Sequence, residues 1–244
     1  MAIDLIILPV LAILFIATLI RSAFGFGEAL ISVPLLALII PIEVAAPVAV
    51  LVSITVAAVV LIQDWQEVHF GSAWRLVLSS LAGIPFGLLL LTMIAEPVVK
   101  ALLAVVIIIF SVHSLLNENQ YQLKDDSRAW LFGFGSGILG GAYGMNGPPL
   151  VVYGALRRWS PQHFRATLQG YFLPASMLVM AGYWFTGLWT PVVTHYYLLA
   201  LPGVILAIFA GRLINRRMNG GRFLIYVHVA LVLVGIILLM TAVI

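Results

Sequence analysis

Residues 140–149, with the sequence GGAYGMNGPP, are the part of the chain best suited to bind a small solute. Glycine and proline at this density interrupt a helix, and inside a membrane the freed backbone groups need other partners. Broken helices in membrane proteins present N–H groups and the positive end of the helix dipole to anions. The segment therefore predicts an anion site containing Gly144, Asn146 and Gly147. The alternative is a tight turn that lets two helices pack closely.

A second glycine pair, Gly25 and Gly27, is followed directly by Glu28 in an otherwise apolar stretch. A carboxylate within a membrane is costly, so Glu28 is a functional candidate by default. It could take up a proton and couple proton movement to transport. Equally, it could cap the helix that follows it. We expect Gly25 and Gly27 to form a second anion-binding break.

Arg165 and Gln169 lie near the start of the apolar segment 164–186. An inward-facing arginine offers a forked set of donors to a sulfonate, sulfite or carboxylate group. The alternative is an interfacial anchor whose charged end reaches the lipid headgroups. Gln169 adds a neutral hydrogen-bonding group on the same helix.

Other kinds of chemistry have little support in the sequence. The five histidines show no metal-ligand spacing on one helix face, and the chain has no cysteine. There is no phosphate-binding loop and no plausible nucleophile–base arrangement. We therefore expect no metal, no cofactor, no nucleic-acid partner and no enzymatic activity.

The composition places these residues in a membrane. Of the 244 residues, 63% are hydrophobic and only 9% are charged, whereas a soluble domain usually carries about 25% charged residues. Too little polar surface remains to cover a soluble globule. The apolar runs lack the alternation typical of strands, which predicts an all-α, polytopic membrane protein.

Ten apolar segments are expected, and three are too short to span alone at about 1.5 Å per residue. The short segments are 29–40, 129–142 and 147–157; the longer ones are 3–24, 43–62, 72–93, 98–116, 164–186, 193–213 and 223–243. We interpret the first as a membrane helix and not as a signal peptide, because it has no basic start.

The segments follow one pattern twice: a helix running into glycines, a short apolar piece with proline, and later a proline in a long helix. Pro34 and Pro85 are 51 residues apart, and Pro149 and Pro202 are 53 apart. This predicts a duplication, with one repeat at 1–116, a polar connecting loop at 117–128 and a second repeat at 129–244.

The basic residues predict the orientation. Two arginine-rich loops, near Arg157 and near Arg216, are separated by two long helices, so both should lie in the cytoplasm. If 129–142 and 147–157 form a hairpin that enters and leaves on one side, the two repeats are inverted. If they form one broken crossing, the repeats are parallel. We favour inversion.

With these residues in view, the chain resembles the TauE/SafE family of sulfite and organosulfur-anion exporters over nearly its whole length. The resemblance rests on residues 25–34 (GFGEALISVP), on 140–150 and on 164–168 (FRATL). Family members often have glycines where this chain has Glu28 and Ala29. The resemblance implies a multi-pass transporter of the prokaryotic inner membrane for small sulfur-containing anions.

The expected function is therefore a secondary transporter of sulfite or organosulfonates, exporting them by alternating access between the two repeats. An anion channel and a non-transporting membrane subunit are the alternatives. Substrate, direction, proton coupling and oligomeric state stay open, a homodimer included.

Overall fold

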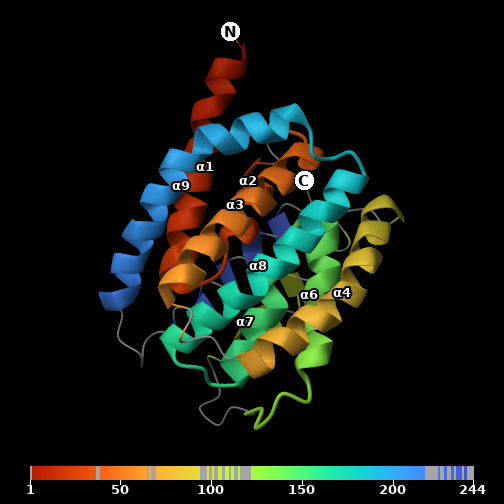
Figure 1. The fold of residues 1–244 in the computed structure, drawn as a ribbon, viewed down its shortest axis with the longest axis vertical. Helices are drawn as coiled ribbons and strands as arrows, with labels where there is room; N and C mark the ends of the chain where they lie inside the picture. Colours follow the sequence, from red (N-terminus) through yellow and green to blue (C-terminus); the bar gives the residue numbers. More distant parts are fainter. Residues whose placement is uncertain are drawn as a thin grey trace.

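The computed structural model of the chain describes residues 2–36, 39–64, 66, 70–93 and 122–217, with single positions between 98 and 115 and between 225 and 240. The expected helices at 98–116 and 223–243 lie largely outside the described residues. Every regular element within the described ranges is a helix (Figure 1). The expectation of an all-helical fold is confirmed.

Within the described part of the first half, four helices have bounds that follow the apolar runs. They are α1 (Ala2–Phe24), α2 (Glu28–Leu36), α3 (Ile42–Asp64) and α4 (Phe70–Met93). Helix α1 ends where Gly25 takes a positive φ angle. Helix α3 follows Pro41, whose carbonyl accepts hydrogen bonds from the first turn of the helix.

The second half repeats this order with α6 (Ala129–Tyr143), α7 (Gly147–Leu156), α8 (Pro161–Phe185) and α9 (Pro191–Arg217). Helix α8 begins in a favourable way, because the Ser160 side chain accepts a hydrogen bond from the backbone N–H of His163 and Pro161 occupies the first turn.

Among the described residues, four helices are long and apolar enough to cross a membrane. These stretches are Ile6–Phe24, Glu43–Gln63, Gly71–Leu89 and Pro191–Asn215, in α1, α3, α4 and α9. Helices α6 and α7 have 15 and 10 residues, so neither spans a bilayer alone, as the sequence predicted. The chain is a polytopic helical membrane protein.

The two halves show the same spacing of elements. Three residues separate α1 from α2 and three separate α6 from α7, and the starts of α2 and α7, like those of α3 and α8, are 119 positions apart. Helix α1 packs against α9 and α6 packs against α4, while α3 and α8 lie against each other (Figure 1). The helix that precedes each break, α1 in the first half and α6 in the second, thus packs mainly on the other half. Inversion of the halves across a bilayer stays a prediction.

Helix α7 folds back along α6. The Leu123 N–H donates to the Leu156 carbonyl at 3.0 Å, and the Arg157 guanidinium donates to the Leu123 carbonyl at 2.9 Å. The end of α7 therefore lies beside the residues that precede α6. This geometry favours the hairpin over a single broken crossing for the second short pair.

A carboxylate holds this hairpin to its neighbours. Asp126 accepts hydrogen bonds from Ser72 and Tyr153. It also forms an ion pair with Arg157 Nε at 3.1 Å and a longer one with Arg75 at 3.8 Å. We call Asp126, Ser72, Tyr153 and Arg157 the Asp126 cluster. It joins the connecting loop to the start of α4 and the end of α7.

Small residues bring α4 and α6 into backbone contact. Gly133, Gly137 and Gly141 recur every four residues and form one stripe along α6. A Cβ atom on Gly137 would lie 2.3 Å from the carbonyl oxygen of Ser80 in α4. The stripe is therefore required for the helix spacing, as is common between membrane helices.

Candidate functional site

The first break, at residues 25–27, depends on glycine. Gly25 has a φ angle of +89°, a region that residues with a side chain rarely adopt. A Cβ atom there would also lie 3.1 Å from the Cα of Arg165. The break thus combines a left-handed turn with close contact to α8.

The second break, at residues 144–146, has the same form. Gly144 has a φ angle of +66° and its N–H donates to the Gly140 carbonyl, while the Met145 N–H donates to the Leu139 carbonyl. The Gly144 bond, four residues back to a residue in the last turn, is that of a helix end with a left-handed cap. The Ser136 hydroxyl donates to the Asn146 carbonyl and accepts from Tyr171. Neighbouring side chains therefore fix the position of Asn146.

The two breaks meet at one small cavity. Its lining combines residues from the first break and α2, from the second break and from the helices between them: Arg21, Gly27, Glu28, Ala29, Leu30, Ser53, Met145, Asn146, Gly147 and Phe172. Its volume of about 10 Å³ corresponds to about one water molecule. The cavity is therefore closed to a larger solute in this conformation.

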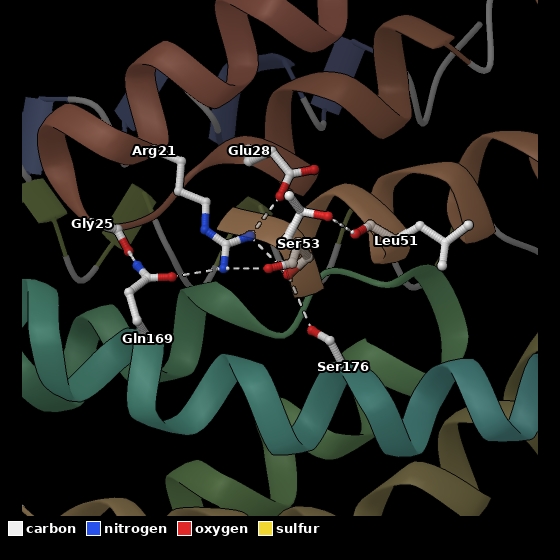
Figure 2. A network of polar contacts seen from close by, with 8 residues as sticks. Arg21, Gly25, Glu28, Leu51, Ser53, Gln169 and Ser176 are labelled. Carbon is white, nitrogen blue, oxygen red and sulfur yellow. Dashed lines mark hydrogen bonds and ion pairs between the residues drawn. The ribbon is translucent and has the colours of Figure 1, made fainter. Parts of the chain in front are cut away.

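Arg21 is the centre of a buried polar network beside this cavity (Figure 2). Its Nη1 donates to Glu28 Oε2 at 2.6 Å and to the Ser53 hydroxyl at 2.7 Å. Its Nη2 donates to Gln169 Oε1 at 2.8 Å and to the Ser53 carbonyl at 3.3 Å. The Phe172 ring lies 4.7 Å from the guanidinium carbon, within the range of a cation–π contact.

The position of the charged pair suits both helix ends. Arg21 lies in the last turn of α1 and Glu28 in the first turn of α2, where the helix dipoles favour a cation and an anion, respectively. Only 3% of Arg21 and 1% of Glu28 is exposed. Among the described residues, the second carboxylate oxygen, Oε1, has no hydrogen-bond partner, so Glu28 pairs with Arg21 and makes no capping bond to the backbone.

Helix α8 holds the first break through two side chains. Gln169 Nε2 donates to the Gly25 carbonyl at 2.9 Å, and Arg165 Nε donates to the Ser22 carbonyl at 3.0 Å. Ser22 lies in the last turn of α1, where carbonyls lack intrahelical partners, and Gly25 directly follows the helix. Arg165 is buried and faces the protein, so the interfacial-anchor alternative is not what the structure shows.

The two breaks differ in the donors they offer. Helix α2 begins at Glu28, so the N–H groups of its first turn have no partner within the helix. Helix α7 has Pro148 and Pro149 in its first turn, and proline has no N–H. The second break instead contributes the Asn146 side chain, which makes no hydrogen bond within the described part of the chain.

The predicted site residues divide into two groups. Gly27, Glu28, Asn146 and Gly147 line the cavity. The other four do not line the cavity. Two of them form the turns of the breaks, Gly25 and Gly144, and two bond to the backbone at the first break, Arg165 and Gln169. Their role in binding a substrate stays a prediction.

Sequence reasoning missed Arg21, Ser53, Ser176 and Phe172. The sequence did contain an indication for Arg21, because an arginine at the end of an apolar run is a functional candidate for the same reason as Glu28. Only seven positions separate the two residues. Nothing in the sequence indicated Ser53, whose hydroxyl also lies 3.1 Å from that of Ser176. A serine in a membrane helix is too common to stand out.

Comparison with known proteins identifies the family of the chain. A family model described as sulfite exporter TauE/SafE matches residues 10–238. The chain belongs to the TauE/SafE family. Comparison with curated proteins and with solved structures gave no match. Members of the TauE/SafE family are membrane transporters and not enzymes, so this chain is a membrane transporter of the sulfite-exporter family.

Proposed function

We propose that this TauE/SafE protein is a secondary transporter that carries sulfite or small organosulfonates through the cavity where its two breaks meet. The observation that supports this most directly is the lining of the cavity by residues of both breaks, with the buried Arg21 beside them. An arginine fork fits the paired oxygens of a sulfite or sulfonate group.

Three kinds of donor are available to the anion. They are the first-turn N–H groups of α2, the amide of Asn146 and the guanidinium of Arg21. A helix N-terminus favours an anion through its dipole and its N–H groups. Gly25, Gly144, Arg165 and Gln169 would position these donors.

The small size of the cavity favours a carrier over a channel. A channel needs a continuous water path, whereas the space between the breaks holds about one water. We propose that the cavity opens to each side in turn as the helices of one half move against those of the other.

The proposed setting is the inner membrane of a prokaryotic cell, with the arginine-rich loops in the cytoplasm. A cell interior that is electrically negative favours anion export by about 2.3 kcal/mol per charge for each 100 mV. This electrical driving force acts only on an anion that crosses with its charge uncompensated.

Flux measurements test this function directly. The purified protein is reconstituted into vesicles, and uptake of radiolabelled sulfite is compared with uptake by protein-free vesicles. We expect saturable uptake that unlabelled sulfonates inhibit. The absence of flux for sulfite, sulfonates and carboxylates alike would refute the proposal, and ion currents far above carrier turnover would identify a channel.

Replacing Asn146 with alanine tests the site. The change removes an amide that lines the cavity, and a hydrogen bond to a charged group contributes about 1.5–3 kcal/mol. We expect the KM for sulfite to rise at least about tenfold. Gln66→Ala, which removes an exposed amide away from the cavity, serves as the control and should leave the KM unchanged. An unchanged KM in the Asn146 variant would place the substrate elsewhere.

A further inference from the structure

We propose that Glu28 is a built-in counter-ion that occupies the place of the substrate on Arg21, so that a singly charged anion binds only when Glu28 takes up a proton. This inference rests on the proposed function and specifies how transport is driven. It predicts that anion and proton cross together and that no net charge moves.

The hydrogen bonds of Arg21 show why the anion and Glu28 compete. Nη1 is shared by Glu28 and Ser53, and Nη2 by Gln169 and the Ser53 carbonyl. Of these acceptors, only the Glu28 carboxylate carries a negative charge. The adjacent cavity holds about one water, so a sulfite or sulfonate group reaches the fork only after the carboxylate has moved away.

The charge balance of the site then requires a proton. The empty site is neutral, because Arg21 and Glu28 compensate each other at 2.6 Å. If a singly charged anion displaced an ionised Glu28 from Arg21, the buried site would carry a net negative charge, which costs several kcal/mol. Protonation of Glu28 restores neutrality. Empty and loaded states are then both neutral and can both change conformation within the membrane.

In the described part of the chain, the surroundings of Glu28 provide no other acid for this proton. Arg21 comes from α1, Ser53 from α3, Asn146 from the second break and Gln169 from α8. The remaining charged group near the break is Arg165, whose Nε is bound to the Ser22 carbonyl. Within the described part of this network, Glu28 is the one carboxylate.

The experiment compares two driving forces in proteoliposomes. Sulfite uptake is measured at mildly acidic pH, where sulfite is mostly singly charged, either with an inward proton gradient or with an inside-positive membrane potential. The proteins are the wild type, Glu28→Gln and the matched control Glu43→Gln. Glu43 is an exposed carboxylate at the start of α3, away from the network. Changes in the ionisation of sulfite itself are common to all three proteins.

The expected outcomes differ by an order of magnitude. For the wild type and Glu43→Gln, a gradient of one pH unit raises the accumulation ratio about tenfold, and a potential leaves it unchanged. In Glu28→Gln the empty site carries the positive charge of Arg21. The conformational change that returns the empty site across the membrane therefore moves charge. A potential of about 60 mV should then raise accumulation about tenfold, and the proton gradient should have no effect beyond that seen with protein-free vesicles.

Each other result overturns the inference in a recognisable way. If Glu28→Gln responds to both gradients as the wild type does, Glu28 has only a structural role, although the protein is still a sulfite transporter. If the wild type carries no anion, the proposed function fails as well. If Glu28→Gln does not fold, sulfite-induced currents of the wild type on a supported membrane decide the matter. Neutral cotransport gives no current, and a steady current refutes it.

Discussion

At the scale of single residues, Arg21 is the group on which the site depends. Its guanidinium contacts side chains from α2, α3 and α8, so one side chain links both halves of the chain. Removing one partner of a buried ion pair costs more than removing both, because the remaining charge is left without compensation.

Arg21→Met should therefore destabilise the protein by about 3–5 kcal/mol, since Glu28 stays buried without its partner. The double variant Arg21→Met with Glu28→Gln should recover most of this loss but should still not bind sulfite. Thermal unfolding in detergent and sulfite binding measure the two effects. Lys124→Met, which removes an exposed cation, is the control for loss of positive charge. A double variant as unstable as the single one would show that the guanidinium acts mainly through its contacts with Ser53 and Gln169.

At the scale of helices, the glycine stripe of α6 sets the distance to α4. Gly137→Ala would place a methyl group 2.3 Å from a backbone oxygen of α4. Backbone cannot turn aside as a flexible side chain can, so the helices must separate. Overpacking of this kind costs about 1–3 kcal/mol, which we expect as a lower midpoint of thermal unfolding.

The same helix supplies the control for this prediction. A Cβ atom on Gly135 would have only the Pro149 ring near it, at 4.0 Å. Gly135→Ala makes an identical chemical change and should leave stability within about 1 kcal/mol of the wild type. Equal midpoints for the two variants would show that α4 and α6 are not held at this spacing.

The helices themselves were largely predictable from the sequence. Apolar runs gave the bounds of α3 and α6 to within two residues, because continuous apolar segments in a membrane have helices as their main solution. Gly25 and Gly144 marked the breaks because a left-handed backbone needs glycine.

The contacts between the halves could not be predicted. The pairing of Arg21 with Gln169 joins positions 148 residues apart, and no local pattern encodes such a distance. The alternatives for Arg165 differ only in the direction of its side chain, which packing decides. The sequence therefore located the cavity residues near each break but not the arginine that links them.

At the scale of the whole molecule, two polar clusters join the halves, in addition to the packing of α1 on α9, of α3 on α8 and of α4 on α6. One is the Arg21 network at the breaks. The other is the Asp126 cluster, where the loop between the halves contacts α4 and α7. When one half moves against the other, the hydrogen bonds and ion pairs of these two clusters either are kept or break.

Asp126→Asn should weaken the Asp126 cluster. Arg157 would lose its charged partner at 3.1 Å, at a cost of about 1.5–3 kcal/mol. We expect faster cleavage by trypsin after Lys124 and a lower midpoint of thermal unfolding. Asp125→Asn changes a neighbouring exposed carboxylate, which bonds only locally to Ser127, and should leave both unchanged. If both variants resist trypsin equally, Asp126 does not restrain the loop.

The ion pair across the first break also has a consequence for biogenesis. When α1 leaves the ribosome it carries a cation in its last turn, and the residue that neutralises this cation is seven positions further on, at the start of α2. Releasing α1 alone into lipid would expose an unmatched guanidinium to hydrocarbon, which is unfavourable. We therefore expect the translocon to retain α1 until α2 has emerged, so that both helices enter the bilayer as one unit.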